Sequence, residues 1–231
     1  MEYGQFCPIS KSMEVLGEKW TVLILRELHM GATRFSELQR GLSLISPTVL
    51  TKRLNDLANA ELILRRKISG QRGYEYHLTQ AGKETLPFIL AIGEWGMRWA
   101  RGGLNDSDLD IELLMLYLQR SIKTENLPGD KSIIKFIFTD QKVLQNWWLL
   151  VSGCKVDICL DDPGKEVDVY LSTDLRTMVE CWMGDRSYAS AIKEQRMKLV
   201  GPKVLTRNIQ HWIADATFAD IRPAVDISLF S

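Results

Sequence analysis

Short polar side chains share one side of the segment that begins at Ser46. They are two threonines, a lysine and an amide: Thr48, Thr51, Lys52 and Asn55. Hydroxyl, amide and ammonium groups near a helix start can bond to base edges in a DNA major groove and to phosphates. An ordinary solvated helix face has a similar composition, so the surrounding elements must decide between the two interpretations.

The elements before and around this segment predict a helix-turn-helix arrangement. Apolar residues recur at helical spacing over residues 13–16 and 20–28, and a third short helix is expected from Arg34. Ser46 is a favourable N-cap and Pro47 suits the first helical position. The inward stripe of the fourth helix has the i, i+4, i+7 spacing, as Leu50, Leu54 and Leu57.

A basic β-hairpin is expected directly after that helix. Residues 62–67 and 74–78 are two short β-type runs around a Gly-rich tip, and four cations lie on it: Arg65, Arg66, Lys67 and Arg72. A solvated basic hairpin is the alternative, but its position after a helix-turn-helix pattern favours a wing that contacts DNA. The predicted DNA-binding residues are therefore Ser46, Pro47, Thr48, Thr51, Lys52, Asn55, Arg65 and Arg72.

The next segment predicts a single long helix from Thr79 to about Arg101. One apolar stripe runs along it at i, i+4, i+7 and i+11: Phe88, Ile92, Trp95 and Trp99. The stripe could pack within its own domain, but proteins that read two-fold DNA sites need a dimer contact. We therefore predict that these four residues form a dimer interface.

Three motifs in this order resemble the HxlR family of bacterial winged-helix transcription regulators. They are CPISKSMEVLGEKWTVLILREL, RFSELQRGLSLISPTVLTKRLNDL and YEYHLTQAGKETL followed by GEWGMRW, within residues 5–101. The resemblance implies a homodimer joined through the first and last helices of the domain. It also implies DNA contact through the helix at Ser46 and the hairpin near Arg72. Cys7 matches a cysteine that senses oxidants in some members of that family.

The bulk composition is that of an ordinary globular protein, and charge divides unevenly along it. The 231 residues are 45% hydrophobic and 25% charged, with 29 Lys and Arg against 29 Asp and Glu. Residues 1–100 hold 13 cations and 10 anions (+3), which leaves 16 and 19 (−3) for the rest. No signal peptide pattern and no apolar run of about 20 residues is present. We expect a cytoplasmic protein without membrane insertion.

The polar break around residues 102–108 predicts a domain boundary. We expect a DNA-binding and dimerisation domain over residues 1–103 and a second domain over residues 110–231. Helix and strand patterns alternate there: a helix from about Ile111, strands at 133–138, 147–151, 155–160 and 167–172, and helices from about Asp174 and Ser187. A short strand at 198–201 and a helix opened by Pro202 follow. The predicted class is α+β, with helices on one face of a sheet.

This second half resembles the sterol carrier protein type-two domain. The segment that carries the resemblance is VDVYLSTDLRTMVECWMGDRSYASAIKEQRMKLVGPKVLTRNIQHWI. The resemblance implies a tunnel for lipids or other apolar molecules. Large apolar groups are the candidates for its lining, although core packing explains any one of them: Trp147, Trp148, Met178, Trp182 and Trp212.

Three functions remain open at this point. The leading one is a DNA-binding transcription regulator, acting as a homodimer, whose second domain senses a small apolar effector. A lipid carrier or an enzyme with an accessory helical domain is the second, and a ligand-free assembly module the third. An enzyme is disfavoured because His29, His77 and His211 lie in separate elements and no catalytic motif is present. We expect no cofactor, and the four cysteines show no metal-binding spacing.

Overall fold

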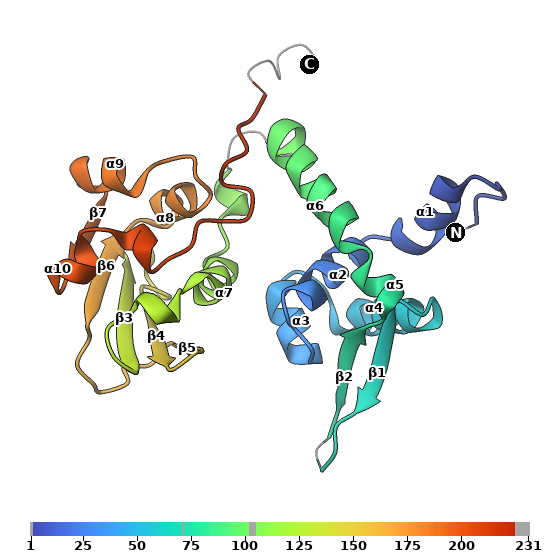
Figure 1. Cartoon of the computed structure of the whole chain (residues 1–231), viewed down its shortest axis with the longest axis horizontal. Helices are drawn as coiled ribbons and strands as arrows, with labels where there is room; N and C mark the ends of the chain where they lie inside the picture. Colours follow the sequence, from blue (N-terminus) through green and yellow to red (C-terminus); the bar gives the residue numbers. More distant parts are fainter. Residues whose placement is uncertain (1, 71, 102–104, 225–231) are drawn as a thin grey trace. The chain divides into compact units, whose positions relative to one another are not determined.

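The computed structural model describes residues 2–70, 72–101 and 105–224 of the chain (Figure 1). These fall into two compact units, Met1–Trp95 and Gly96–Ser231, and each is described by itself. The predicted break at Gly102-Gly103-Leu104 lies outside the described residues. The domain limits 1–103 and 110–231 therefore stay a prediction.

The first unit is a small helical domain with one hairpin. Its elements are α1 (Pro8–Leu16), α2 (Thr21–His29), α3 (Phe35–Gly41), α4 (Pro47–Asn59), β1 (Ile63–Lys67), β2 (Tyr74–Leu78), α5 (Gln80–Lys83) and α6 (Leu86–Trp95). Its core lies between α2, α3, α4 and the hairpin, around Ile24, Leu38, Leu54 and Tyr76. The predicted order of helices and hairpin is confirmed.

The single long helix predicted from Thr79 to Arg101 is wrong. Thr79 does cap a helix, since its Oγ1 accepts a hydrogen bond from Gly82 N at 3.1 Å. That helix, α5, ends at Lys83, and α6 begins at Leu86. Pro87 explains the break, because proline has no N–H to continue the i→i−4 ladder to Lys83. After α6 the chain continues as a π-helical turn over Gly96–Ala100.

The second unit contains a five-stranded sheet. Its strands are β3 (Lys131–Phe138), β4 (Asn146–Ser152), β5 (Lys155–Cys159), β6 (Val169–Thr173) and β7 (Met197–Val200), in the order β5-β4-β3-β6-β7. The β3–β6 pair is parallel and the other pairs are antiparallel. The strand predictions are therefore confirmed within a few residues at each end.

Helices cover one face of this sheet (Figure 1). They are α7 (Ile111–Ser121), α8 (Leu175–Trp182), α9 (Tyr188–Lys193) and α10 (Lys203–Thr206), with short 3-10 turns at Asp106–Asp108, Thr124–Asn126 and Ile209–His211. The helix expected after Pro202 is interrupted between α10 and the last turn. One core joins these helices to alternate strand residues such as Phe136, Leu149 and Leu171, which is the period-two burial expected of a sheet covered on one side. No described helix has both the length and the apolar character that a bilayer crossing requires.

Candidate nucleic-acid interface

Helix α4 presents the predicted polar side to solvent. Ser46 Oγ accepts a hydrogen bond from Val49 N at 3.3 Å, and Pro47 occupies the first turn. Leu50, Leu54 and Leu57 are buried in the first unit's core. Because these leucines fix the rotation of α4, the opposite side faces outward, and Thr48, Thr51, Lys52 and Asn55 are all exposed.

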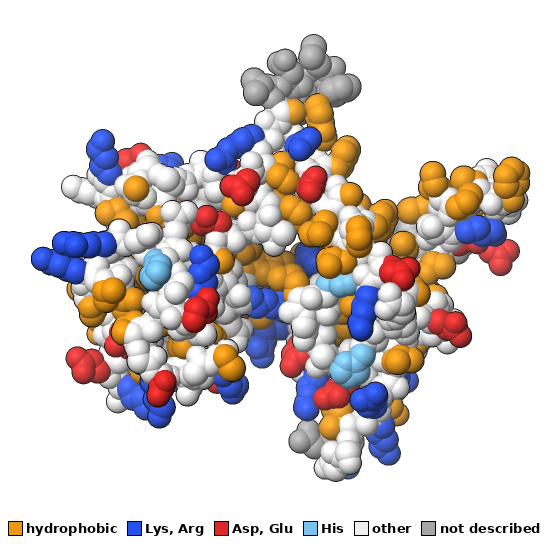
Figure 2. All heavy atoms as spheres, in the orientation of Figure 1, with side chains coloured by type: hydrophobic (Ala, Val, Ile, Leu, Met, Phe, Trp, Pro, Cys, Tyr) orange, Lys and Arg blue, Asp and Glu red, His pale blue; other side chains and the backbone are white. Residues whose placement is uncertain are grey.

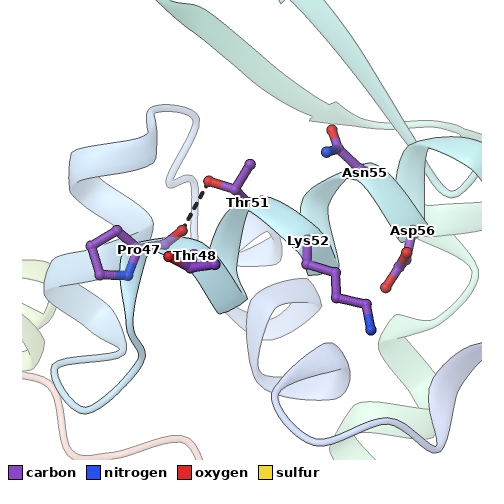
Figure 3. A pocket seen from close by; sticks show the side chains of 6 residues that line it. All are labelled: Pro47, Thr48, Thr51, Lys52, Asn55 and Asp56. Atoms are coloured by element: carbon purple, nitrogen blue, oxygen red, sulfur yellow. Dashed lines mark hydrogen bonds between the residues drawn. The ribbon is translucent and has the colours of Figure 1, made fainter.

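The exposed side of α4 outlines an open hollow of about 570 Å³ (Figure 3). It is lined by Pro47, Thr48, Thr51, Lys52, Asn55 and Asp56. Thr51 Oγ1 donates its proton to Pro47 O at 2.8 Å, so this hydroxyl can offer lone pairs and a methyl group to a ligand. The exposed Asn55 amide can both donate and accept hydrogen bonds, as pairing with an adenine edge requires.

Asp56 is a member of this surface that sequence reasoning missed. It points to the same side as Lys52 in Figure 3 and accepts a hydrogen bond from Arg53 Nη1 at 3.1 Å. The spacing could have identified it, because Asp56 follows four residues after Lys52 and residues at that spacing share one side of a helix. A carboxylate here limits how closely phosphates can approach the C-terminal half of α4.

The hairpin β1–β2 is anchored to the helical part of the unit. Its five residue pairs run from Ile63↔Leu78 to Lys67↔Tyr74. Tyr76 N donates to Thr33 O at 2.8 Å, and Arg34 forms a bridge with Glu75. The segment before α3 thus acts as a third short strand, which holds the hairpin in a defined position beside α3.

Four cations are exposed on this hairpin: Arg65, Arg66, Lys67 and Arg72. The Arg65 guanidinium lies 3.5 Å from the centre of the Tyr74 ring, a cation–π contact that restrains its direction while leaving it accessible. Gln71 lies outside the described residues. The hairpin therefore offers a strip of positive charge suited to a phosphate backbone.

The helices expected to form a dimer contact are unburied, and they carry exposed apolar side chains. Neither α1 nor α6 contains a buried residue. Phe6 is fully exposed, Trp95 is 60% exposed, and Phe88, Ile92 and Trp99 are also exposed. Figure 2 shows hydrophobic side chains gathered over both helices. Large apolar surfaces are normally covered in folded proteins, so this surface is suited to a protein partner.

Cys7 is the N-cap residue of α1 and is partly exposed. Hydrogen bonds from the backbone N–H groups of Ser10 and Ile9 stabilise its thiolate, and the Ser10 side chain adds to them. They hold the pKa of this thiol below its ordinary value. The environment therefore favours the reactive form of the cysteine.

The five apolar residues suggested for a ligand tunnel do not share one wall. Trp147, Met178 and Trp212 are buried in the core of the second unit. Trp148 follows Trp147 on β4 and projects from the other face of the sheet, where the Lys135 amine lies 4.6 Å from its ring centre. Trp182 stacks on Tyr117 at 5.2 Å and donates to Ser121 Oγ at 3.0 Å.

The first unit is a winged helix-turn-helix, with α4 in the position of the recognition helix and β1–β2 as the wing. The HxlR-like helix-turn-helix family model matches residues 15–103. The uncharacterised HTH-type transcriptional regulator YvaP of Bacillus subtilis strain 168 is 32% identical over 102 residues, which cover 43% of this chain and 94% of YvaP. The chain belongs to the HxlR-like helix-turn-helix family.

Further relatives share the same part of the chain. An uncharacterised HTH-type transcriptional regulator of Mycobacterium tuberculosis strain H37Rv is 38% identical over 89 residues, covering 38% of this chain. The match spans 56%, or about half, of that relative's length. The reduced form of the transcriptional regulator YodB from B. subtilis is 26% identical, with a TM-score of 0.38, covering 43% of this chain and all of that one.

Proposed function

We propose that this protein is a DNA-binding transcriptional regulator that acts as a homodimer. The observation that carries the proposal is the pairing of an exposed polar side on α4 with the cationic hairpin β1–β2 in one unit. Side chains of α4 read base edges in the major groove, and the hairpin contacts the backbone or the minor groove. The sequence-named residues Ser46, Pro47, Thr48, Thr51, Lys52, Asn55, Arg65 and Arg72 form this interface.

The exposed apolar side chains of α1 and α6 support the proposed dimer. Two copies that join through α1 and α6 cover surfaces that a monomer leaves in water, including Phe88, Ile92 and Trp95. A two-fold dimer presents two α4 helices, so its operator is a pseudo-palindrome with half-sites about one helical turn, or a multiple of it, apart. The relatives' names as transcriptional regulators agree with this role.

Replacing Arg72 with alanine should weaken binding to all DNA sequences alike. Arg72 is an exposed cation of the hairpin, and a phosphate contact carries no sequence information. In a titration of Kd against salt, the slope of log K against log salt should fall by about one unit. The ratio of operator to random-DNA affinity should stay unchanged.

The matched control for Arg72 is Lys193→Ala, which removes the same charge from an exposed position on α9 of the second unit. That variant should keep the wild-type slope. A wild-type slope in Arg72→Ala would show that the hairpin does not touch DNA. Equal affinity of the wild type for operator and random DNA would contradict the regulatory role.

We also propose that Cys7 is a reactive thiol that adjusts DNA affinity on oxidation. The pKa of free cysteine is about 8.5. Because the pKa of Cys7 is lowered, its thiolate forms at a lower pH than in free cysteine, and it is lost as pH falls through the lowered pKa. Alkylation of Cys7, followed by peptide mass spectrometry, should therefore reach half its maximal rate at a lower pH. Brief peroxide treatment should change operator affinity in the wild type and leave Cys7→Ser unaffected. No change in either protein would make Cys7 a structural N-cap only.

For the second unit we propose a small apolar effector. In the family that this half resembles, a strand leads to a helix, a Gly-Asp loop, a short helix, a strand that ends at a glycine and a final helix. The order β6, α8, Gly184-Asp185, α9, β7 before Gly201, and α10 agrees with this and supports the proposal. An effector regulates only if it binds two states of the dimer unequally, with a coupling of about 1–3 kcal/mol. Mass spectrometry of extracts from native protein tests this. An extract with no small molecule, together with no response of tryptophan fluorescence to fatty acids, would favour the assembly-module alternative.

A further inference from the structure

Arg53 is a basic residue of the recognition helix whose charge is turned inward. It lies next to Lys52 in sequence, but its side chain is only 12% exposed. Nε donates to Lys19 O at 3.0 Å, Nη2 to Glu18 at 2.6 Å and Nη1 to Asp56 at 3.1 Å. All three guanidinium nitrogens are therefore occupied, so Arg53 is poorly placed to bind a phosphate.

The distant ends of these contacts lie in the turn between α1 and α2. Glu18 and Lys19 are 35 and 34 residues away from Arg53 in sequence. The turn has a defined shape, because Trp20 has φ 80° in the left-handed region and Thr21 N donates to Glu18 O at 3.1 Å. The planar guanidinium of Arg53 binds both a carboxylate and a carbonyl of this turn. These two contacts fix the distance of the turn from α4 and also its orientation.

The same turn follows immediately after α1, one of the two unburied apolar helices. Gly17, the C-cap of α1, is directly followed by Glu18. The contact Glu18–Arg53 therefore joins the C-terminal end of α1 to α4 directly.

We propose that Arg53 and Glu18 form a strut that sets the position of the recognition helix relative to α1. Arg53 is a positioning residue and contacts no base. The inference rests on the proposed DNA-binding function and goes beyond it, because it assigns sequence discrimination to a carboxylate that lies outside α4. Loss of the strut leaves charge contacts in place but misplaces the side chains that read bases.

The direction in which Glu18→Ala changes the affinity for DNA tests the strut. Glu18→Ala removes a negative charge, so simple electrostatics predicts tighter DNA binding. The strut predicts the opposite: specific affinity should fall about tenfold, the size of losing one good base contact. Affinity for random DNA and the slope of log K against log salt should stay at wild-type values. The probe is a duplex that the full-length wild-type protein selects from a random pool.

Two further variants separate the explanations. Arg53→Lys keeps the charge but loses the fork, so it should show the same loss, whereas a phosphate contact would survive in lysine. Glu2→Ala removes the same charge as Glu18→Ala from an exposed position and should bind as the wild type does. Circular dichroism of each variant confirms that it is folded.

The outcomes distinguish the strut from the function on which it rests. A wild type without sequence preference would overturn the DNA-reading role and the strut together. A wild type with preference, and a Glu18→Ala variant that binds the selected duplex equally well or more tightly, would overturn the strut alone. A third outcome is that Arg53→Lys keeps its preference for the selected duplex while Arg53→Ala shows a reduced slope of log K against log salt. That outcome would show that Arg53 contacts a phosphate and would overturn the strut.

Discussion

Replacing Trp95 with glutamate should separate the dimer and lower operator affinity by about a hundredfold or more. Trp95 is 60% exposed on α6, a helix without a buried residue. If this helix lies in a dimer seam, the new carboxylate must be buried there without a partner, at a cost far above that of a lost contact. A monomer holds one recognition helix, so it also loses the gain from binding two half-sites at once.

The control for this prediction is Val143→Glu. Val143 is 92% exposed in the turn between β3 and β4 of the second unit, so this variant adds the same charge at an exposed apolar position. Sedimentation equilibrium gives the mass of each protein, and a titration on the selected duplex gives its affinity. A Trp95→Glu protein that remains a dimer with full affinity would place the dimer seam elsewhere.

Replacing Trp212 with alanine should destabilise the second unit by about 3–5 kcal/mol. Trp212 has no exposed surface, and its Nε1 donates to Leu205 O at 2.9 Å. Its carbonyl accepts from Lys123 N at 2.9 Å, which ties the C-terminal segment to the end of α7. The truncation leaves a large cavity in the core and an unpaired carbonyl at Leu205.

Urea unfolding of the full chain, followed by circular dichroism, measures this loss. Because the chain has two compact units, a separate transition is expected for each, and only that of the second unit should move to lower urea. Val204→Ala, at a position that is 66% exposed, is the control and should shift neither transition noticeably. A shift in both transitions would mean that the two units unfold together.

Much of the candidate interface was predictable from the sequence because its signals are local. Ser46, Pro47 and the leucine spacing determine where α4 begins and which side it buries, all within about three turns. The hairpin follows from two β-type runs around a Gly-rich tip, and the exposure of its cations follows from their charge. Thr48, Thr51, Lys52 and Asn55 were identified correctly as one exposed side.

Contacts between distant residues were not predictable in this way. Helical spacing already placed Lys52 and Arg53 on different sides of α4, but it did not indicate that Arg53 binds Glu18, which is far away in the chain. The bridge from Arg34 to Glu75, which anchors the hairpin, is also long-range. Adjacent strand residues must face opposite sides, but only the tertiary structure shows that Trp147 belongs to the helix-covered core while Trp148 packs beside Lys135.

The sequence by itself determined the order of the elements, the N-cap of α4 and the apolar stripe that contains Phe88 and Ile92. The tertiary structure decided which charges remain available. Local patterns set φ and ψ over a few residues, whereas the direction of a long side chain depends on the partner that packing brings within hydrogen-bond distance. Lys52 and Arg53 are adjacent cations on one helix, and only the contacts with the turn before α2 show that Arg53 is held away from a ligand.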